Sequence, residues 1–283
     1  EIYMEIILGK TAGFCNGITR AVEKAEEELQ KVDKIECLGD LLHNSQVLNK
    51  LKNEGLIVIN NIEEAKEKVI IRAHGVKKDV YTYAEEHNVE LIDCTCPKVL
   101  KIHKTAEELS NENYYIIVIG EKDHAEVVGT FSFCKNGEII QNIEELKSRI
   151  ETLNKKDKIA VLTQTTYNLQ KFFEIEKYLK ENITTEIKIC NGICNATEIR
   201  QKETEEISKK VDYMIIIGGK KSSNTNKLYE ISQKNCKRAI KIEEVTELYN
   251  EDFKNISKIG VMAGASTPRT SIEAVINYLK ERK

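Results

Sequence analysis

Short runs of apolar residues alternate along the chain with longer stretches in which apolar residues recur every three or four positions. The runs at residues 34–38, 114–119 and 213–217 are rich in β-branched side chains and predict strands. The longer stretches, around Phe173 and Val275 for example, predict helices with one apolar face. Strands that alternate with helices favour right-handed crossovers and parallel sheets, which helices cover on both faces. The pattern therefore predicts an α/β fold.

Three cysteines occupy the same place in this pattern, after an apolar run and before a helical stretch: Cys15, Cys96 and Cys194. A glycine lies 24 residues after each cysteine, at Gly39, Gly120 and Gly218. A polar residue lies 28 residues after each cysteine, at His43, His124 and Ser222. Spacing that is repeated at two offsets indicates an internal threefold repeat.

The repeat predicts three domains, each a small, mainly parallel sheet flanked by helices, related by a pseudo-threefold axis. Their expected bounds are residues 15–95, 96–193 and 194–283. The third repeat lacks a final strand before Lys283, whereas the apolar run at residues 5–8 leads into Cys15. We therefore expect residues 1–14 to complete the third domain.

Polar residues also follow the third predicted strand of each repeat, at His74, Thr165 and Ser266. Ligands bind beyond the carboxyl ends of the strands in open parallel sheets. A threefold arrangement would bring these polar tips and the three cysteines together at the centre of the molecule. The expected lining of this central site is His43, His74, His124, Glu126, Thr165, Ser222, Asn224 and Ser266.

The composition narrows the chemistry of such a site. The chain has 283 residues, eight cysteines and a net charge of −3, and no apolar run approaches the roughly 20 residues that span a bilayer. This charge does not favour binding to nucleic acid or to a membrane. Eight cysteines are too sparse for a disulfide scaffold, so we expect free thiols in a reducing, cytoplasmic compartment.

Three thiolates without a fourth protein ligand favour an iron–sulfur centre over zinc, because structural zinc usually takes four ligands. A 4Fe–4S cluster held by three cysteines leaves one iron open to substrate. Cys94 and Cys190 compete for the same role, but the spacing selects Cys96 and Cys194. The remaining thiols are expected only to pack: Cys37, Cys134 and Cys236.

The other tip residues offer imidazole, hydroxyl and amide groups, which suit a phosphate or diphosphate. Glu126 is the single carboxylate among them and is the candidate for acid–base work. His87 and His103 lie outside the tips, and we interpret them as surface or satisfied core residues.

Several motifs together resemble the 4-hydroxy-3-methylbut-2-enyl diphosphate reductase family, in order and over essentially the whole chain. They are residues 13–17 (GFCNG), 43–44 (HN), 73–76 (AHGV), 95–97 (TCP), 124–127 (HAEV), 163–166 (TQTT), 222–224 (SSN) and 264–266 (GAS). The family usually has proline where this chain has Ala125, and often arginine where it has Ala12.

The resemblance implies an oxidoreductase that uses a 4Fe–4S cluster to remove the allylic hydroxyl of (E)-4-hydroxy-3-methylbut-2-enyl diphosphate, with this hydroxyl at the open iron. The products are isopentenyl diphosphate and dimethylallyl diphosphate, in the last step of the methylerythritol phosphate (non-mevalonate) isoprenoid pathway. The implied electron donor is ferredoxin or flavodoxin.

By resemblance, the residues take three roles. The implied cluster ligands are Cys15, Cys96 and Cys194. The implied diphosphate-binding residues are His43, His74, Ser222, Ser223, Asn224 and Ser266. The residues implied around the substrate hydroxyl and the proton supply are His124, Glu126 and Thr165. Two rival functions are a redox-neutral dehydratase with an open-iron cluster, and a non-enzymatic iron–sulfur sensor or metal-binding scaffold. A dehydratase would not need an external reductant.

Overall fold

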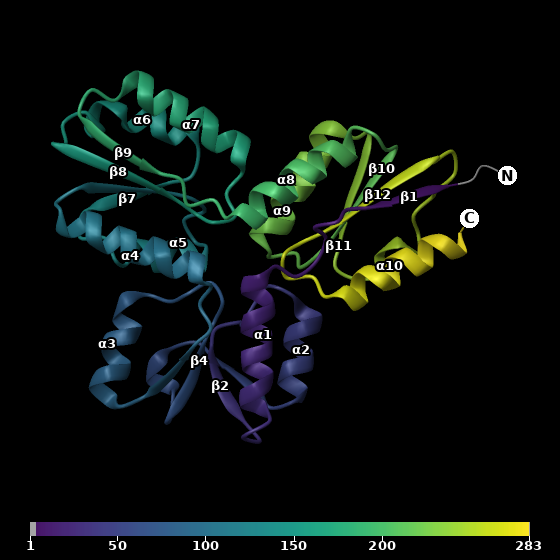
Figure 1. Cartoon of the computed structure of the whole chain (residues 1–283), viewed down its shortest axis with the longest axis horizontal. Coiled ribbons are helices and arrows are strands. Elements are labelled where there is room, and N and C mark those ends of the chain that lie inside the picture. The colour runs from purple at the N-terminus through teal and green to yellow at the C-terminus, as the bar shows by residue number, and fades with distance from the viewer. Residues whose placement is uncertain (1–3, 283) are drawn as a thin grey trace. The chain divides into compact units, whose positions relative to one another are not determined.

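The computed structural model describes residues 4–282 and contains three four-stranded sheets flanked by helices (Figure 1). Every strand pair described is parallel. The predicted α/β class with three parallel sheets is therefore confirmed.

The first sheet has the strand order β3-β2-β4-β5. Its strands are β2 (Ile35–Leu38), β3 (Leu56–Ile59), β4 (Lys68–Ile71) and β5 (Glu90–Asp93). The helical elements that precede or connect them are α1 (Asn16–Leu29), α2 (Ser45–Asn53), η1 (Ile62–Glu64) and α3 (Lys78–His87). Ala84 of α3 packs on Val69 and Ile71 of β4, while α1 lies on the opposite side of the sheet from α3 (Figure 1).

The second sheet has the order β7-β6-β8-β9. Its strands are β6 (Tyr115–Ile119), β7 (Gly137–Ile140), β8 (Lys158–Thr163) and β9 (Glu186–Cys190). Its helices are α4 (Pro97–Asn111), α5 (Ala125–Phe131), α6 (Ile143–Leu153) and α7 (Leu169–Asn182), with α4 and α5 on one face and α6 and α7 on the other (Figure 1). Successive residues of β6 serve opposite faces: Ile116 packs with α4, and Ile117 packs with α7. Each such buried side chain stabilises the fold by roughly 1.5–3 kcal/mol.

The third sheet has the order β11-β10-β12-β1. Its strands are β10 (Tyr213–Ile217), β11 (Arg238–Ile242), β12 (Lys258–Ala263) and β1 (Glu5–Leu8). Its helical elements are α8 (Asn195–Ser208), α9 (Ser223–Asn235), η2 (Val245–Leu248) and α10 (Arg269–Glu281). β1 pairs with β12 and takes the place that β5 and β9 take in the other two sheets. All three sheets thus share one strand order, although the bounds given above for the three domains stay a prediction.

One local expectation differs from the structure. The similar acidic segments at residues 61–65 (NIEEA), 142–146 (NIEEL) and 243–248 (EEVTEL), which follow β3, β7 and β11, each predict a helix start in the sequence, but only the second forms an α-helix. η1 and η2 are 3₁₀ helices of three and four residues. After β3 the reason is length, because few residues separate Ile59 from Lys68, where the next strand begins.

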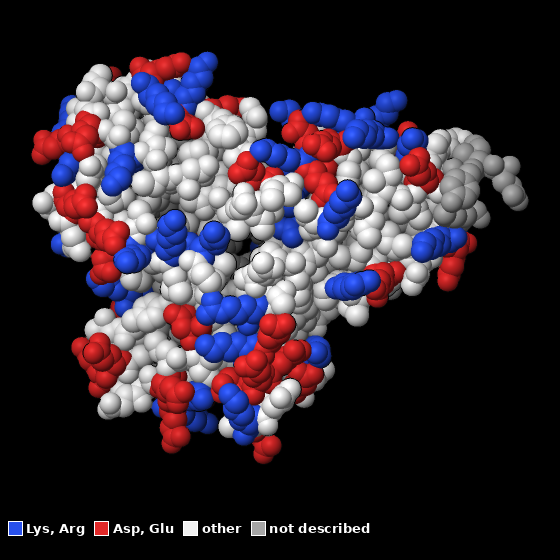
Figure 2. Space-filling model, viewed as in Figure 1, with Lys and Arg blue, Asp and Glu red and all other residues white. Residues whose placement is uncertain are grey.

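The chain divides into two compact units. The larger unit contains Arg20–Leu41 and Leu51–Cys194, and so holds the first and second sheets. The described parts of the smaller unit are residues 4–19, 42–50 and 195–282, which hold the third sheet. Basic and acidic side chains are interspersed on the face of the molecule in Figure 2. Within the described residues, no helix is both long and apolar enough to cross a membrane.

Candidate functional site

Cys15, Cys96 and Cys194 have equivalent backbone surroundings. The N–H of each donates a hydrogen bond to a carbonyl in the turn after a third strand: Ala265 (3.1 Å), Ala73 (3.0 Å) and Thr165 (3.0 Å), respectively. The residue after each cysteine begins a helix, α1, α4 or α8. The positive end of a helix dipole stabilises a thiolate, so all three positions suit thiolate ligands.

The two competing cysteines differ from these three. Cys94 is buried, and burial raises the pKa of its thiol to about 11. Burial also raises the pKa of Cys190. Because the thiolate is the form that binds metal, these shifts disfavour both residues as ligands and support the choice of Cys96 and Cys194.

The remaining three thiols donate hydrogen bonds to backbone carbonyls inside the fold. Cys37 donates to Gly39 (3.2 Å), Cys134 to Thr130 (3.7 Å) and Cys236 to Val211 (3.4 Å). Burial raises the pKa of Cys37 and of Cys134 to about 12. All eight cysteines are free thiols, and these three are placed as packing residues.

Glu126 is the most unusual carboxyl group of the larger unit. Glu126 lies in the first turn of α5 and is only 2% exposed to solvent. Both of its oxygens accept hydrogen bonds from one residue, Thr165: from the backbone N–H at 2.5 Å and from the hydroxyl group at 2.7 Å. Burial raises the pKa of Glu126 to about 7, although the two hydrogen bonds from Thr165 oppose the shift.

Two purely structural roles for Glu126, a helix cap and an ion pair with a lysine, do not fit these contacts. The cap of α5 is His124, whose Nδ1 accepts the N–H of Glu126 at 3.2 Å. Lys122, the nearest candidate for an ion pair with Glu126, pairs instead with Glu145. The pKa of Glu126, about 7, thus leaves a substantial fraction of this buried carboxyl group protonated near neutral pH.

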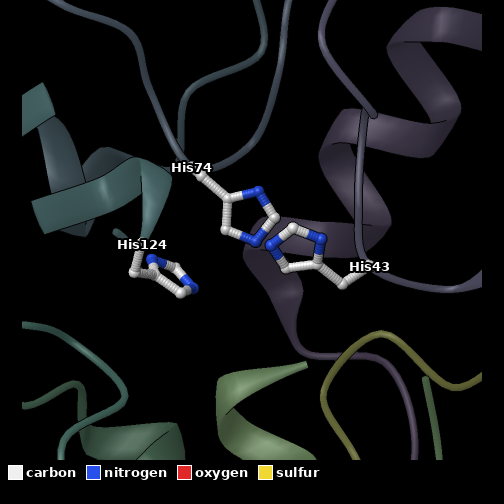
Figure 3. Close-up of side chains that lie close together, drawn as sticks. All are labelled: His43, His74 and His124. Carbon is white, nitrogen blue, oxygen red and sulfur yellow. The ribbon is translucent and has the colours of Figure 1, made fainter. Parts of the chain in front are cut away.

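His124 and His74 bring the tips of two repeats together in the larger unit (Figure 3). His74 follows β4 of the first sheet, and His124 follows β6 of the second. Their rings are 5.5 Å apart between centroids and meet edge to face at 79°. Because Nδ1 of His124 accepts the N–H of Glu126, a neutral His124 carries its proton on Nε2.

In the smaller unit, the tip at His43 meets the tip at Ser266. The hydroxyl group of Ser266 donates a hydrogen bond to the backbone carbonyl of His43 at 3.2 Å. The same carbonyl lies against Gly219, where an added Cβ would come within 2.2 Å of it, so only glycine fits there. Tips of the first and third repeats thus lie side by side.

The third tip residue of the smaller unit begins a helix. Ser222 caps α9 by accepting the N–H of Thr225 at 3.3 Å, and Ser223 and Asn224 form the first turn. Asn224 is only 3% exposed, and neither atom of its amide group has a hydrogen-bond partner within the described residues. An unsatisfied buried amide is costly, so a ligand is the natural partner for it. The N-terminus of a helix favours an anion at this place.

The structure therefore places the predicted site residues in two groups. The larger unit holds His74, His124, Glu126 and Thr165, together with Cys96 and Cys194. The smaller unit holds His43, Ser222, Ser223, Asn224 and Ser266, together with Cys15.

The two histidines outside the tips have different surroundings. His87 is exposed and stacks on Tyr83, as expected of a surface residue. His103 is buried, but neither ring nitrogen has a hydrogen-bond partner within the described chain, so it is not the satisfied core residue that was expected. Burial lowers the pKa of His103 to about 4, so this imidazole stays neutral at pH 7.

Two residues that hold the loop before Cys15 were missed in the sequence. Arg200, buried on α8, donates to the carbonyls of Thr11 and Gly13, each at 2.9 Å. Glu203, one turn later, accepts the N–H groups of Lys10 (2.7 Å) and Thr11 (2.9 Å). The sequence feature that could have identified them is the spacing of Arg200 and Glu203, three residues apart in a helix with few apolar residues.

The family model described as LytB protein matches residues 6–280. The chain belongs to the LytB family.

Two relatives with similar sequences carry the same enzyme name. The 4-hydroxy-3-methylbut-2-enyl diphosphate reductase of Caldanaerobacter subterraneus subsp. tengcongensis is 41% identical over 99% of this chain and 98% of its own length. The reductase of Aquifex aeolicus is 37% identical over 98% of this chain and 96% of its own length.

Solved structures of LytB relatives also match. The E-1-hydroxy-2-methyl-but-2-enyl-4-diphosphate reductase of Plasmodium falciparum matches with a TM-score of 0.92 and 32% identity, over 98% of this chain and 88% of that one. A second solved structure, that of an (E)-4-hydroxy-3-methyl-but-2-enyl diphosphate reductase described as the terminal enzyme of the non-mevalonate pathway, matches with a TM-score of 0.69 and 36% identity, over 98% of this chain and 99% of that one.

Proposed function

We propose that the chain reduces (E)-4-hydroxy-3-methylbut-2-enyl diphosphate to isopentenyl diphosphate and dimethylallyl diphosphate. This oxidoreductase activity is the last step of the non-mevalonate isoprenoid pathway. The observation that carries the proposal is the Glu126–Thr165 pair, a buried acid with a pKa of about 7, in a chain of the LytB family. Loss of a hydroxyl group as water needs such a proton donor.

The cofactor of the proposed reaction is a 4Fe–4S cluster held by Cys15, Cys96 and Cys194. The chemistry of the donor set supports it, because each of these thiols lies at a helix N-terminus, whereas burial raises the pKa of four of the other five. When bound, the cluster supplies electrons and a Lewis-acidic iron to the allylic C–O bond.

Residues of the larger unit deliver the proton. In the neutral form of Glu126, the carboxyl O–H donates to the Thr165 hydroxyl oxygen, which reverses the hydrogen bond of 2.7 Å that Thr165 donates in the structure. The Thr165 hydroxyl group then passes its own proton to the departing oxygen. His124, on the same turn as Glu126, orients the substrate hydroxyl group with its Nε2–H. Burial keeps this path dry, which protects the proton from exchange with solvent.

Diphosphate binding falls to His43, Ser222, Ser223, Asn224 and Ser266 of the smaller unit, together with His74. The unsatisfied amide of Asn224 and the N-terminus of α9 support this role. Because the diphosphate is remote from the bond that breaks, its binding energy positions the alcohol for reaction.

The test is anaerobic reconstitution with iron and sulfide, followed by turnover with reduced methyl viologen. We expect both diphosphate products, and no reaction without the reductant. A product formed without the reductant would show a redox-neutral dehydratase instead and would contradict the proposal.

The cysteine assignment is tested in the same preparations. Cys15→Ser, Cys96→Ser and Cys194→Ser are each expected to lose the cluster absorbance, whereas Cys94→Ser and Cys37→Ser keep it. Cys94 is the matched control, since it lies two residues from Cys96. Retention of iron by Cys96→Ser together with its loss from Cys94→Ser would reverse the assignment.

A further inference from the structure

A groove opens in the smaller unit directly beside the loop that carries Cys15. Its volume is about 520 Å³, and it runs between the segment after β1 and helix α10. Gly13 and Phe14, the two residues before Cys15, form part of one wall. Ile272 and Ile276 of α10 lie on the opposite wall. A molecule bound in this groove would therefore contact the two residues that directly precede Cys15, a proposed cluster ligand.

The floor and walls of the groove offer apolar surface to solvent. Leu8, at the end of β1, is 44% exposed although it is a large apolar residue. Phe14 and Ile276 are half-buried and continue the same surface. A single exposed leucine is ordinary, but Leu8, Phe14 and Ile276 together give this groove an apolar part beside its charged rim.

The rim of the groove is positively charged, in a chain whose net charge is −3. The charged residues that line it are Lys10, Arg269, Lys280 and one acid, Glu273. Arg269 pairs with Glu273 at 2.7 Å. Lys10 and Lys280 are exposed. The carboxylate of Glu203, which is not part of the lining, lies beside Lys10 and accepts its backbone N–H at 2.7 Å. The lining thus carries a net charge of +2, from three cations and one anion.

The groove is preformed, because α8 fixes the loop that forms its wall. Glu203 accepts the backbone N–H groups of Lys10 and Thr11, and Arg200 donates to the carbonyls of Thr11 and Gly13. A surface that is ordered before binding loses little conformational entropy when a partner binds.

We propose that this groove is the docking site of the electron donor, a small one-electron carrier protein with acidic residues around its redox centre. The inference rests on the proposed function, in which one allylic alcohol takes up two electrons and two protons to give one hydrocarbon group and one water. Two molecules of reduced carrier each give up one electron, so two successive dockings complete one turnover. Weak electron-transfer complexes bury little surface, which fits a short groove with a few charges. Opposite charges steer such encounters and speed association.

The test measures carrier binding and turnover separately. The probe is a plant-type [2Fe–2S] ferredoxin labelled with ¹⁵N and titrated with the holoenzyme by NMR at low salt. The Lys10→Gln/Lys280→Gln double variant is expected to raise the Kd by about tenfold, and the difference from wild type should shrink as salt screens the charges. Turnover with reduced methyl viologen, a small cation that needs no docking surface, should stay within about threefold of wild type. Lys254→Gln is the matched control, because this exposed lysine precedes the start of β12, whereas Lys10 follows the end of the parallel neighbour β1, so the two lie at opposite ends of these strands.

An unchanged Kd in the double variant, or an equal rise in Lys254→Gln, would overturn the docking site. An equal loss of turnover with both donors would show that the two lysines maintain the fold instead, and this would also overturn it. Wild-type protein that binds the ferredoxin but forms no product with either donor would contradict the proposed function, while the Kd difference would still support the docking site.

Discussion

The two units share a structural feature, the polar turn after a parallel strand, but surround it with different chemical groups. In both, a polar tip after a parallel strand meets the tip of another repeat: His74 beside His124 in the larger unit, and His43 beside Ser266 in the smaller one. The larger unit adds a carboxyl group whose pKa is raised by burial to about 7. The smaller unit adds a helix N-terminus and a buried amide that has no hydrogen-bond partner among the residues described.

This difference shows how one repeat can acquire two roles. A proton donor needs a dry environment that raises the pKa of its carboxyl group, and the buried Glu126 has one. A diphosphate site needs hydrogen-bond donors and a positive potential, which hydroxyl, amide and backbone N–H groups supply without adding negative charge. We therefore propose that the proton donor belongs to the larger unit and that most of the diphosphate-binding residues belong to the smaller one.

The sharpest separation of the two roles is expected from Glu126→Gln. The glutamine keeps the shape of the side chain but has no transferable proton. We expect kcat to fall by about 10²–10⁴, the range for loss of general acid catalysis, with KM within about threefold of wild type. Steady-state kinetics with reduced methyl viologen measure both constants. Glu144→Gln, an exposed change in the same unit, should leave kcat unchanged, and a kcat of Glu126→Gln within threefold of wild type would remove the proton-donor role.

The same variant is expected to gain stability relative to wild type as the pH rises. The folded pKa of Glu126 is about 7 against an ordinary value of 4.5, so the folded state binds this proton more tightly than the unfolded state. The contribution of Glu126 to stability is therefore complete below about pH 4.5 and declines as pH rises to about 7, by roughly 3 kcal/mol. Urea unfolding at about pH 4.5 and about pH 8 should show Glu126→Gln gaining this amount relative to wild type. A difference that does not change with pH would contradict the raised pKa.

A smaller and opposite effect is expected from Asn224→Ala in the smaller unit. Loss of a hydrogen bond to a charged group costs roughly 1.5–3 kcal/mol, so KM should rise by about ten- to a hundredfold, while kcat stays within about threefold. Stability without substrate should change little, because the Asn224 amide has no hydrogen-bond partner in the described part of the chain to lose. Asn235→Ala, at the other end of α9, is the matched control and should leave KM unchanged. A lower kcat with an unchanged KM would place Asn224 in the chemistry and break the division between the units.

Much of this fold could be predicted from the sequence, because a buried parallel strand must be apolar along its whole length. The runs that became β6 and β10 show this, and both are almost completely buried. The repeated spacing also selected Cys96 over Cys94, a choice that the burial of Cys94 now supports. The 3₁₀ form of η1 and η2 could not be predicted, because an acidic start favours any helix and does not fix its length.

The candidate site was predictable in its residue types but not in its contacts. The sequence identified Glu126 and Thr165 as tip residues, but their hydrogen bonds join positions 39 residues apart. Arg200 and Glu203 escaped notice because their partners are mainly backbone groups of a loop about 190 residues away. Contacts of side chains with a distant backbone leave no periodic pattern in the sequence.

The most direct test of the account is the titration of the Glu126 carboxyl group itself, by isotope-edited infrared spectroscopy of protein with ¹³C-labelled glutamate. The account predicts a protonated-carboxyl band that disappears with a midpoint near pH 7 and is absent from Glu126→Gln. A band already lost by about pH 5, as for an ordinary glutamate, would contradict it, and so would the same band in the variant.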